Sequence, residues 1–352
     1  MFFFRIKCDE TELTMDRERR SIMKALKYIS VFSLLILLIT ACGVDDEGKT
    51  SIKLAEVTRS VFYAPQYVAL EKGFFEEEGL DVELQTTWGG DKTMTSLLSD
   101  GADVALVGAE TSMYVYGQDS KDIAINFAQL TQTDGTFLVA KEPKPDFEWE
   151  DVKDSTFLGQ RKGGMPQMVG EFVLKKHGID PQTDLNLLQN VDFENIPGAF
   201  VSGDSEYVQL FEPTASVFEK EGKGHVIASF GEESGKVPYT VFMAKDSFLD
   251  ENEETIKQFT RAVYKAQQWV EEHSAEEIAE VIAPYFEDAD LDILTASMNR
   301  YKEQESFATD PLFGEEEWLN LQEIMDEAGE LPGEVPYEEL VNTEIAEDVM
   351  NE

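Results

Sequence analysis

The residues with the most versatile chemistry, the three histidines, lie far apart in the sequence: His177, His225 and His273. None of them belongs to an HExxH zinc motif, and the sequence contains no GxSxG nucleophile motif and no complete EF-hand calcium loop. An enzyme needs positioned acids, bases, nucleophiles or metals. The sequence therefore predicts no catalytic residue, no metal site and no cofactor, and it favours a binding protein over an enzyme.

Aromatic, acidic and glycine residues at the ends of predicted strands form a second set of candidates, whose chemistry suits the binding of a small molecule. Ligand sites combine aromatic surface with a few directed polar groups, and the strand ends of an open α/β sheet meet at one crevice. The candidates from the first three strands are Arg59, Phe62, Tyr63, Trp88, Gly89, Gly90, Glu110 and Thr111. Those from later in the chain are Gly163, Gly164, Met165, Tyr207, Glu212 and Tyr239.

Several of these candidates also have a purely structural interpretation. Phe62 or Tyr63 could cover the helix that follows, and Trp88 could be a core residue at the end of an alternating strand. Glu110 could cap the next helix, because carboxylates favour helix N-termini. Arg59 could pair with one of the candidate carboxylates and hold the site in register.

Glu110 and Glu212 decide which ligand class the candidates favour. Two carboxylates directed into a site would repel an oxyanion such as nitrate or a sulfonate, which needs hydrogen-bond donors. They would accept hydrogen bonds from an amine, amidine or aminopyrimidine while aromatic rings stack on its face. The residues thus favour a small, flat, nitrogen-rich ligand. For an anion, Arg59 and the Gly163-Gly164 turn before a predicted helix would become the central groups.

The stretch 58–110 must position most of the candidates, and its pattern predicts two βα units. Pro65 suits the first turn of a helix, where its missing N–H costs nothing, and apolar residues at helical spacing follow it. Asp91 is expected to cap a second helix. Three β-like runs end at candidate residues: 51–57, 81–86 and 104–107.

The remaining chain alternates between strand-like and helix-like segments. A proline-broken segment, 141–149, is the predicted first crossover to a second lobe, and 237–244 is the predicted return. The polar tail, 336–352, is expected to pack weakly. Predicted strands are 122–130, 136–140, 157–161, 185–191, 208–211 and 226–229, and predicted helices are 111–116, 167–177, 250–273, 275–283, 291–301 and 315–328, the last four as packing helices of the first lobe.

Two adjacent segments carry a family resemblance: APQYVALEKGFFEEEGLDVEL at 64–84 and GGDKTMTSLLSDGADVALVGAE at 89–110. They resemble the first lobe of bacterial ABC-transporter solute-binding proteins, in the group that serves nitrate, sulfonate, taurine and thiamine-pyrimidine precursors. The resemblance implies an α/β, two-lobed periplasmic-binding-protein-like fold (type II), with mixed sheets flanked by helices and a two-crossover hinge. It also implies that Glu212-Pro213 faces the cleft and that 192–200 leads to a helix that selects the ligand.

The N-terminal part of the chain resembles a bacterial lipoprotein signal. Lys24 and Lys27 precede an apolar run at 29–39, which is shorter than the ~20 residues of a membrane span. A small residue then precedes Cys42, so the resemblance implies cleavage there and a lipid on the Cys42 thiol. A signal anchor with an incidental cysteine is the alternative. Because residues 1–22 contain acidic residues unlike a signal peptide, Met23 is an alternative start to Met1.

Length and charge restrict the remaining possibilities. The chain has 352 residues, more than one hydrophobic core usually holds, and a formal net charge of −42. Such a charge argues against nucleic acid as a partner, since phosphate binding needs clustered Lys and Arg, and favours an acidic, solvated surface. We expect these segments: 1–41, N-terminal extension and signal; 42–50, lipidated tether; 51–142 and 240–352, first lobe; 143–239, second lobe.

The expected protein is thus a monomer that lies outside the cytoplasm, anchored to the cell membrane through lipid on Cys42. Its expected partners are a small-molecule ligand and the permease and ATPase subunits of an ABC importer. The ligand expected from the residues resembles a thiamine-pyrimidine precursor. A sulfonate or nitrate binder, or a lipoprotein sensor with the same fold and no transport role, remains as an alternative.

Overall fold

The computed structural model describes residues 48–116, 118 and 122–352, and Thr50–Glu352 forms one compact unit. The predicted signal segment, Cys42 and most of the predicted tether lie outside the described residues. No helix within the described residues is long and apolar enough to cross a membrane. The letters at 43–50, GVDDEGKT, match a P-loop pattern, but that pattern requires a helix to follow, and Thr50 instead begins a strand.

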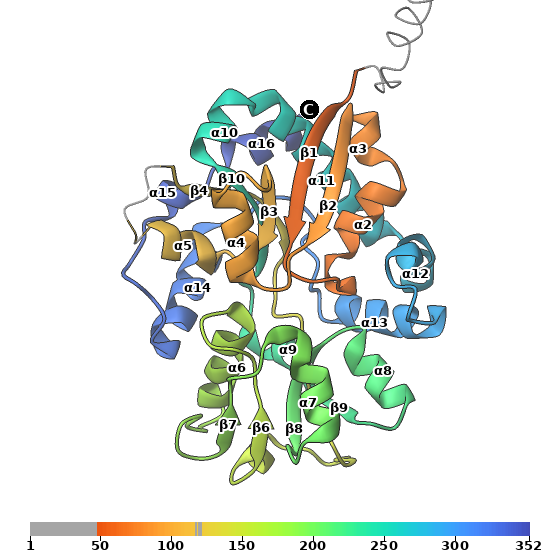
Figure 1. Ribbon diagram of the computed structural model, residues 1–352, viewed down its shortest axis with the longest axis vertical. Coiled ribbons are helices and arrows are strands. Elements are labelled where there is room, and N and C mark those ends of the chain that lie inside the picture. Colours follow the sequence, from red (N-terminus) through yellow and green to blue (C-terminus); the bar gives the residue numbers. More distant parts are fainter. Residues whose placement is uncertain (1–47, 117, 119–121) are drawn as a thin grey trace, which may run out of the picture. The chain divides into compact units, whose positions relative to one another are not determined.

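The first lobe is built on a five-stranded mixed sheet with the order β2-β1-β3-β10-β4 (Figure 1). The strands β1, β2 and β3 pair in parallel, as expected for successive βα units, whereas β10 is antiparallel to both β3 and β4. Their bounds are Thr50–Glu56 for β1, Leu80–Thr86 for β2, Val104–Val107 for β3, Ala124–Thr131 for β4 and Thr240–Lys245 for β10.

The second lobe is built on another five-stranded mixed sheet, with the order β7-β6-β8-β5-β9. Here β6 is parallel to β7 and β8, and β5 is antiparallel to β8 and β9. The bounds are Thr136–Ala140 for β5, Thr156–Leu158 for β6, Asn186–Leu188 for β7, Tyr207–Phe211 for β8 and His225–Ser229 for β9. The two mixed sheets confirm the predicted fold class.

The first crossover between the lobes lies earlier than predicted. Strand β4 belongs to the first sheet and β5 to the second, so the chain crosses between Thr131 and Thr136, not at 141–149. Residues 136–142, assigned above to the first lobe, therefore lie in the second lobe or directly after its strand β5. The return crossover runs from the end of β9 at Ser229 to the start of β10 at Thr240, so most of the predicted return segment, 237–244, is a strand of the first sheet.

Helices cover both sheets (Figure 1). Those with bounds before the return crossover are α2 Ala64–Glu71, α3 Phe74–Glu77, α4 Gly90–Leu98, α5 Glu110–Tyr116, α6 Met165–Lys176, α7 Ile196–Ser202, α8 Thr214–Lys220 and α9 Phe230–Ser234, with 3-10 turns η1 Val61–Tyr63, η2 Trp149–Val152 and η3 Phe193–Asn195. Those after it are α10 Asp246–Glu251, α11 Glu253–Glu272, α12 Ala275–Ile282, α13 Leu291–Glu303, α14 Glu315–Ala328, α15 Tyr337–Leu340 and α16 Glu344–Met350, with η4 Ala283–Tyr285.

The C-terminal helices illustrate how sequence and packing agree and where they differ. The predicted apolar face of α11 is buried, and Ser274 caps α12 through its hydroxyl, which accepts from the Glu277 N–H. The predicted weak packing of the tail is wrong: α16 contacts α11 and buries Ile345 and Val349. Glu352 also pairs with Arg261, with Oε2 and Nε 2.6 Å apart.

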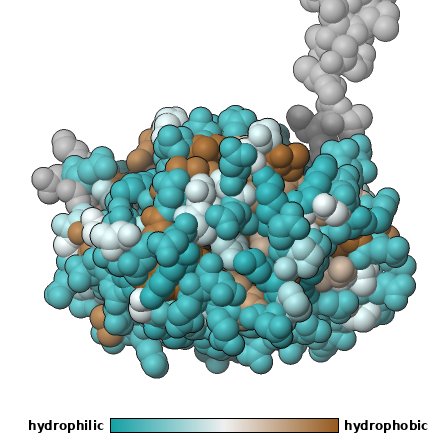
Figure 2. Space-filling model, turned by 90° about the horizontal axis from the view of Figure 1, so that it is seen from below, coloured by the Kyte–Doolittle hydropathy of each residue, from teal (hydrophilic) through white to brown (hydrophobic). Residues whose placement is uncertain are grey.

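Two of these helices connect the lobes, although all were predicted to pack on the first lobe. The helix α13 contacts α8 of the second lobe, and α14 contacts α6. In Figure 1 they lie on opposite sides of the molecule at the level between the two sheets. The lower face of the second lobe is mostly hydrophilic, with small separate apolar patches (Figure 2), as the acidic composition indicates.

Candidate functional site

One candidate site, which we call the main cavity, has a volume of about 500 Å³ and lies between the two lobes. Residues after β1, β2 and β3 meet residues before α6 in its wall, which agrees with the expectation that strand ends face one crevice. This volume is in the range of pockets that hold small molecules. The predicted site residues that line it are Tyr63, Gly89, Gly90, Glu110, Thr111, Gly163, Gly164, Met165 and Tyr239.

Two helices present their N-termini to the main cavity. The helix α4 begins at Gly90 after Gly89, whose φ of 143° favours glycine, and α6 begins at Met165 after Gly164. The N-cap glycine of neither helix supplies a capping side chain, and at the start of α6 the Met165 N–H donates to the Glu110 carboxyl across the cavity. The prediction that Asp91 caps α4 is wrong, because Asp91 lies inside the first turn of the helix.

Glu110 is the buried acidic group of the main cavity. It is the first residue of α5, its side chain is 3% exposed, and its Oε2 atom has no hydrogen-bond partner among the described residues. The carboxyl lies over Gly108, where an added Cβ would come within 2.0 Å of Oε2. A glycine at position 108 is therefore what allows the carboxyl to occupy this place beside the end of β3.

Burial raises the pKa of the Glu110 carboxyl to about 8, although hydrogen bonds from the backbone N–H groups of Glu110 and Met165 act to lower it. Met165 belongs to the second lobe, so the carboxyl contacts both sides of the cavity. At neutral pH the ligand-free protein therefore holds Glu110 mainly as the neutral acid, which can both donate and accept a hydrogen bond.

This raised pKa predicts a pH-dependent stability. Between pH 4.5 and about 8, folded Glu110 keeps a proton that the unfolded chain loses, so the free energy of unfolding should fall as pH rises through that interval. The contribution is at most ~1.4 kcal/mol per pH unit. Urea unfolding of the ligand-free wild type and Glu110→Gln at several pH values should give curves that diverge below pH 8. Parallel curves would contradict the assignment.

Tyrosines form another wall of the main cavity. Tyr63 and Tyr239 are buried, and burial raises the pKa of both phenols further above their usual range. Behind Tyr239 lies Asp134, at the first crossover, which accepts a 2.6 Å hydrogen bond from the Thr136 N–H. Burial raises the pKa of Asp134 to about 6. Neutral tyrosine hydroxyl groups therefore lie between the main cavity and the first crossover.

Charged residues that the sequence analysis did not single out also line the main cavity. Asp91 of the first lobe pairs with Arg161 of the second, with Oδ1 and Nη2 2.8 Å apart, and Lys162 lies beside them. Gln160, Phe193 and Phe211 complete the second-lobe wall. The available signal was that Arg161 ends the predicted strand 157–161 and Lys162 directly precedes the Gly163-Gly164 turn, where a polar group can reach a crevice.

A second, smaller cavity adjoins the main cavity, and we call it the side cavity. Its volume is about 170 Å³, and it shares Thr58, Gln160, Phe193 and Phe211 with the main cavity. Three predicted site residues line the side cavity and are absent from the lining of the main cavity: Arg59, Trp88 and Glu212.

Arg59 is held by the first lobe. Its Nε lies 2.9 Å from Glu56 Oε1, its Nη2 donates to the Thr86 hydroxyl at 3.0 Å, and its guanidinium lies over the rings of Tyr67 and Tyr285. The expectation that Arg59 pairs with a candidate carboxylate is thus corrected, because its partner is Glu56, a residue that sequence reasoning missed. The available signal for this ion pair was the spacing of three residues between Glu56 and Arg59.

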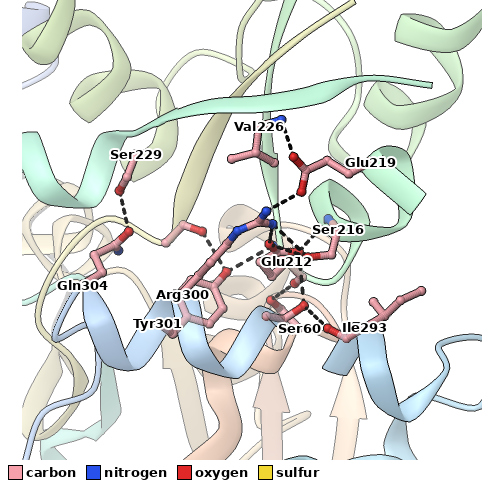
Figure 3. A network of polar contacts seen from close by, with 12 residues as sticks. Ser60, Glu212, Ser216, Glu219, Val226, Ser229, Ile293, Arg300, Tyr301 and Gln304 are labelled. Carbon is pink, nitrogen blue, oxygen red and sulfur yellow. Dashed lines mark hydrogen bonds and ion pairs between the residues drawn. The ribbon is translucent and has the colours of Figure 1, made fainter. Parts of the chain in front are cut away.

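Glu212 is occupied by protein contacts. Its side chain is fully buried and accepts from the Ser216 N–H at 2.8 Å and from Arg300 Nη1 at 2.5 Å, while Arg300 also pairs with Glu219 (Figure 3). The Ser60 hydroxyl donates to the Glu212 carbonyl at 2.7 Å. The network joins α13 and the segment after β1 to the end of β8, so Glu212 connects the lobes and contributes no free acceptor to the main cavity.

Two candidates line neither cavity. Phe62 is fully buried at the hinge, where Gly135 is so close that an added Cβ would lie 2.7 Å from its ring. Its ring also lies 5.5 Å from that of Tyr239 and therefore supports the cavity wall from behind. Tyr207 begins β8, and its hydroxyl donates to the Asp151 carbonyl at 3.1 Å.

The structure also places the histidines. His177 stacks on Trp149 and lies 3.1 Å from Glu233, and His273 stacks on Trp269. None of the three histidines lines either cavity. Within the part of the chain that the structure describes, no group of three or more His, Cys, Asp or Glu side chains is arranged to hold a metal ion.

Several known proteins are similar to this chain in sequence. The NMT1-like family matches residues 45–283. The candidate binding protein YtlA of Bacillus subtilis strain 168 is 62% identical over 327 residues, which cover 93% of this chain and 98% of that protein. The formylaminopyrimidine-binding protein of Halalkalibacterium halodurans is 24% identical over 264 residues, covering 72% of this chain and 77% of that protein.

Solved structures share the fold at low sequence identity. The ligand-binding component of an ABC-type import system from Staphylococcus aureus, with zinc bound, has a TM-score of 0.68 at 15% identity, covering 86% of this chain and 98% of that one. The alkanesulfonate-binding protein SsuA from Xanthomonas axonopodis has a TM-score of 0.67 at 13% identity, and the match covers 83% of this chain and 98% of that one. The desulfurization enzyme DSZB has a TM-score of 0.62 at 11% identity, and the match covers 86% of this chain and 99% of that one. The fold is therefore that of ABC-import binding proteins, and it also occurs in an enzyme.

Proposed function

This chain belongs to the NMT1-like family, and we propose that it is the extracytoplasmic solute-binding component of an ABC importer that captures a flat, nitrogen-rich molecule such as an aminopyrimidine. The ligand enters between the lobes, contacts both of them, and favours the closed conformation by contacts that only that conformation completes. The closed protein then delivers the ligand to a permease that works with an ATPase. Lipid on Cys42 holds the monomeric protein at the membrane.

The observation that carries the ligand class is the buried carboxyl of Glu110, with Oε2 unpartnered in the wall of the main cavity. An aminopyrimidine presents a ring nitrogen next to an amino N–H. The proton held by Glu110 can pass to that ring nitrogen, and the resulting carboxylate accepts hydrogen bonds from both nitrogen groups. Charged hydrogen bonds of this kind are stronger than neutral ones. The name of the H. halodurans relative is consistent with this class.

An anion is the second candidate, and a specific observation favours it. The N-termini of α4 and α6 reach the main cavity, and Arg161 and Lys162 lie in its wall. Helix N-termini and basic side chains bind oxyanions well. A sulfonate or nitrate would use these groups and would leave Glu110 neutral. Arg161 is already paired with Asp91, and we therefore rank the aminopyrimidine first.

We propose that the protein binds its ligand without converting it. In support of this, its three histidines lie outside both cavities. A lipoprotein sensor with the same binding step is the alternative to a transport protein. Permease and ATPase genes beside the gene for this chain would favour transport, and their absence would favour a sensor.

Native mass spectrometry of the full-length protein, followed by identification of any co-purified small molecule, tests the proposal. Calorimetric titration with 4-amino-5-aminomethyl-2-methylpyrimidine, its formylamino analogue, ethanesulfonate and nitrate then compares the two ligand classes. We expect a pyrimidine to co-purify and to bind, with the anions much weaker. A bound sulfonate or nitrate, or tight binding of the anions alone, would move the recognition role from Glu110 to the helix N-termini and Arg161.

A further inference from the structure

The side cavity has no role in the function proposed so far. We propose that it is a second binding subsite, which accepts a ring-sized, uncharged or cationic group of the same ligand whose first part occupies the main cavity. This subsite deepens the proposed function and rests on it, because the proposed function identifies the group that occupies the main cavity. It predicts a ligand made of two linked flat groups.

The connection between the cavities supports a single ligand. Thr58, Gln160, Phe193 and Phe211 line both of them, so a molecule beside Glu110 can extend past these four residues into the side cavity. The volume of the side cavity, about 170 Å³, is of the same order as the ~150 Å³ apolar cavity that holds one benzene molecule. One aromatic ring is therefore the group that this space accommodates.

The walls of the side cavity are suited to stacking. Trp88 comes from the first lobe and Phe193, Ile196 and Pro197 come from the second. Phe193 packs on Phe211 with ring centroids 5.9 Å apart, whereas Trp88 is 42% exposed and has no ring partner among the described residues. A flat group between the lobes can thus stack on the indole and contact the apolar residues opposite it.

The backbone of Trp88 is a further sign of a functional position. Its φ is 60°, in the left-handed region that a bulky residue rarely adopts. This conformation costs free energy, and it holds a large aromatic side chain at the rim of a cavity instead of in the core. Strained residues of this kind gather at ligand sites.

Charge decides which rings the side cavity prefers. Its three charged side chains are Arg59, Glu194 and Glu212. Arg59 pairs with Glu56, and Glu212 pairs with Arg300, so both are neutralised by the protein. Glu194 is exposed and has no ion pair among the described residues. The remaining negative charge favours a neutral or cationic ring and disfavours an anionic one.

The test varies the first part of the ligand and the ring independently. The full-length protein is titrated calorimetrically with 4-amino-2-methylpyrimidine and its 5-benzyl derivative, and with methanesulfonate and phenylmethanesulfonate. Each titration is repeated with Trp88→Ala, with Trp88→Phe, which keeps a ring, and with the control Leu319→Ala, which removes an exposed apolar side chain on α14 outside both cavities.

We expect the benzyl group to raise the affinity of wild type and Leu319→Ala about ten-fold, the equivalent of one well-packed ring contact. Trp88→Ala should lose that gain in affinity, although it should still bind the compound without the benzyl group as tightly as wild type does. Trp88→Phe should keep part of the gain. A gain seen only with the sulfonate pair would support the subsite and overturn the aminopyrimidine proposal. No Trp88-dependent gain with either pair, or an equal loss for both members of a pair, would overturn the subsite.

Discussion

Replacing Glu110 with glutamine should weaken the binding of an aminopyrimidine ten-fold or more. The amide keeps the size of the side chain but cannot pass a proton to the ring nitrogen, so the charged hydrogen bonds of the complex, about 1.5–3 kcal/mol, are lost. Calorimetric titration of wild type and Glu110→Gln near pH 7 measures the change. In wild type the affinity should also fall above pH 8, where Glu110 loses the shared proton, and the variant should show no such fall.

Glu171→Gln is the matched control for this substitution. Glu171 is buried as Glu110 is, but it lies outside both cavities and accepts hydrogen bonds from Gln167 and Gln189, each at 2.7 Å. The Glu171→Gln variant should bind the ligand with nearly the same affinity as wild type. Equal affinities for wild type and Glu110→Gln would remove the carboxyl from the site and leave the α4 and α6 N-termini as the recognition groups.

Replacing Arg300 with methionine should lower the free energy of unfolding by about 3–5 kcal/mol, because the buried carboxylate of Glu212 then loses its cation. The Ser216 N–H and the Ser297 hydroxyl still donate to that carboxylate, at 2.8 and 3.2 Å, but they carry no charge. The expected loss is large because Glu212 is 1% exposed, and solvent cannot replace the guanidinium. Urea unfolding at constant pH measures it.

Lys220→Met gives a control at the same pair of helices. Lys220 ends α8 and pairs with Asp290, which directly precedes α13, and both side chains are largely exposed. Loss of such a surface pair should lower the stability far less than loss of the buried Arg300 pair, because solvent already screens both charges. Arg300→Met combined with Glu212→Gln should recover part of the stability, since no uncompensated charge remains. If the two single variants were equally stable, Glu212 would not depend on Arg300.

The ligand argument changes when the tertiary contacts are known. The sequence suggested two carboxylates directed at the ligand, but Glu212 is paired with Arg300, and only Glu110 remains in the main cavity. The repulsion expected for an anion is therefore smaller than the sequence implied, and the helix N-termini and Arg161 become the competing feature. For this reason the ligand class needs the direct comparison of pyrimidines with sulfonates.

Much of the first lobe could be predicted from local patterns, because the physics there is local. Alternating and buried runs predicted β1, β2 and β3 to within about one residue, and Pro65 lies in the first turn of α2. The cavity residues after these strands followed from the rule that parallel strand ends share an edge. Ser274 was a recognisable cap because its own side chain satisfies the N–H three residues later.

The crossover shows where local patterns end. All five residues of the run Thr136–Ala140 are buried in the structure. A buried run of this length could belong to either of the two sheets. The short segment before it contains Gly135 and resembles a hairpin turn. Its assignment to the second lobe depends on pairing with β8 and β9, more than 60 residues away in the sequence, and no local pattern contains that information.

Sequence patterns alone were enough to predict β1 to β9 in order, most of the longer helices, the fold class and the edge of the first sheet on which a ligand site would lie, but they missed β10, α8 and α9. Periodicity, prolines, glycines and caps act over a few residues, so each can be recognised in a short segment. Which polar residues face the cavity, and which already have protein partners, became clear from the tertiary contacts. Glu212 meets Arg300 across 88 positions, and Phe62 meets Gly135 at the hinge. The free energy of a buried charge or ring depends on partners that folding brings together.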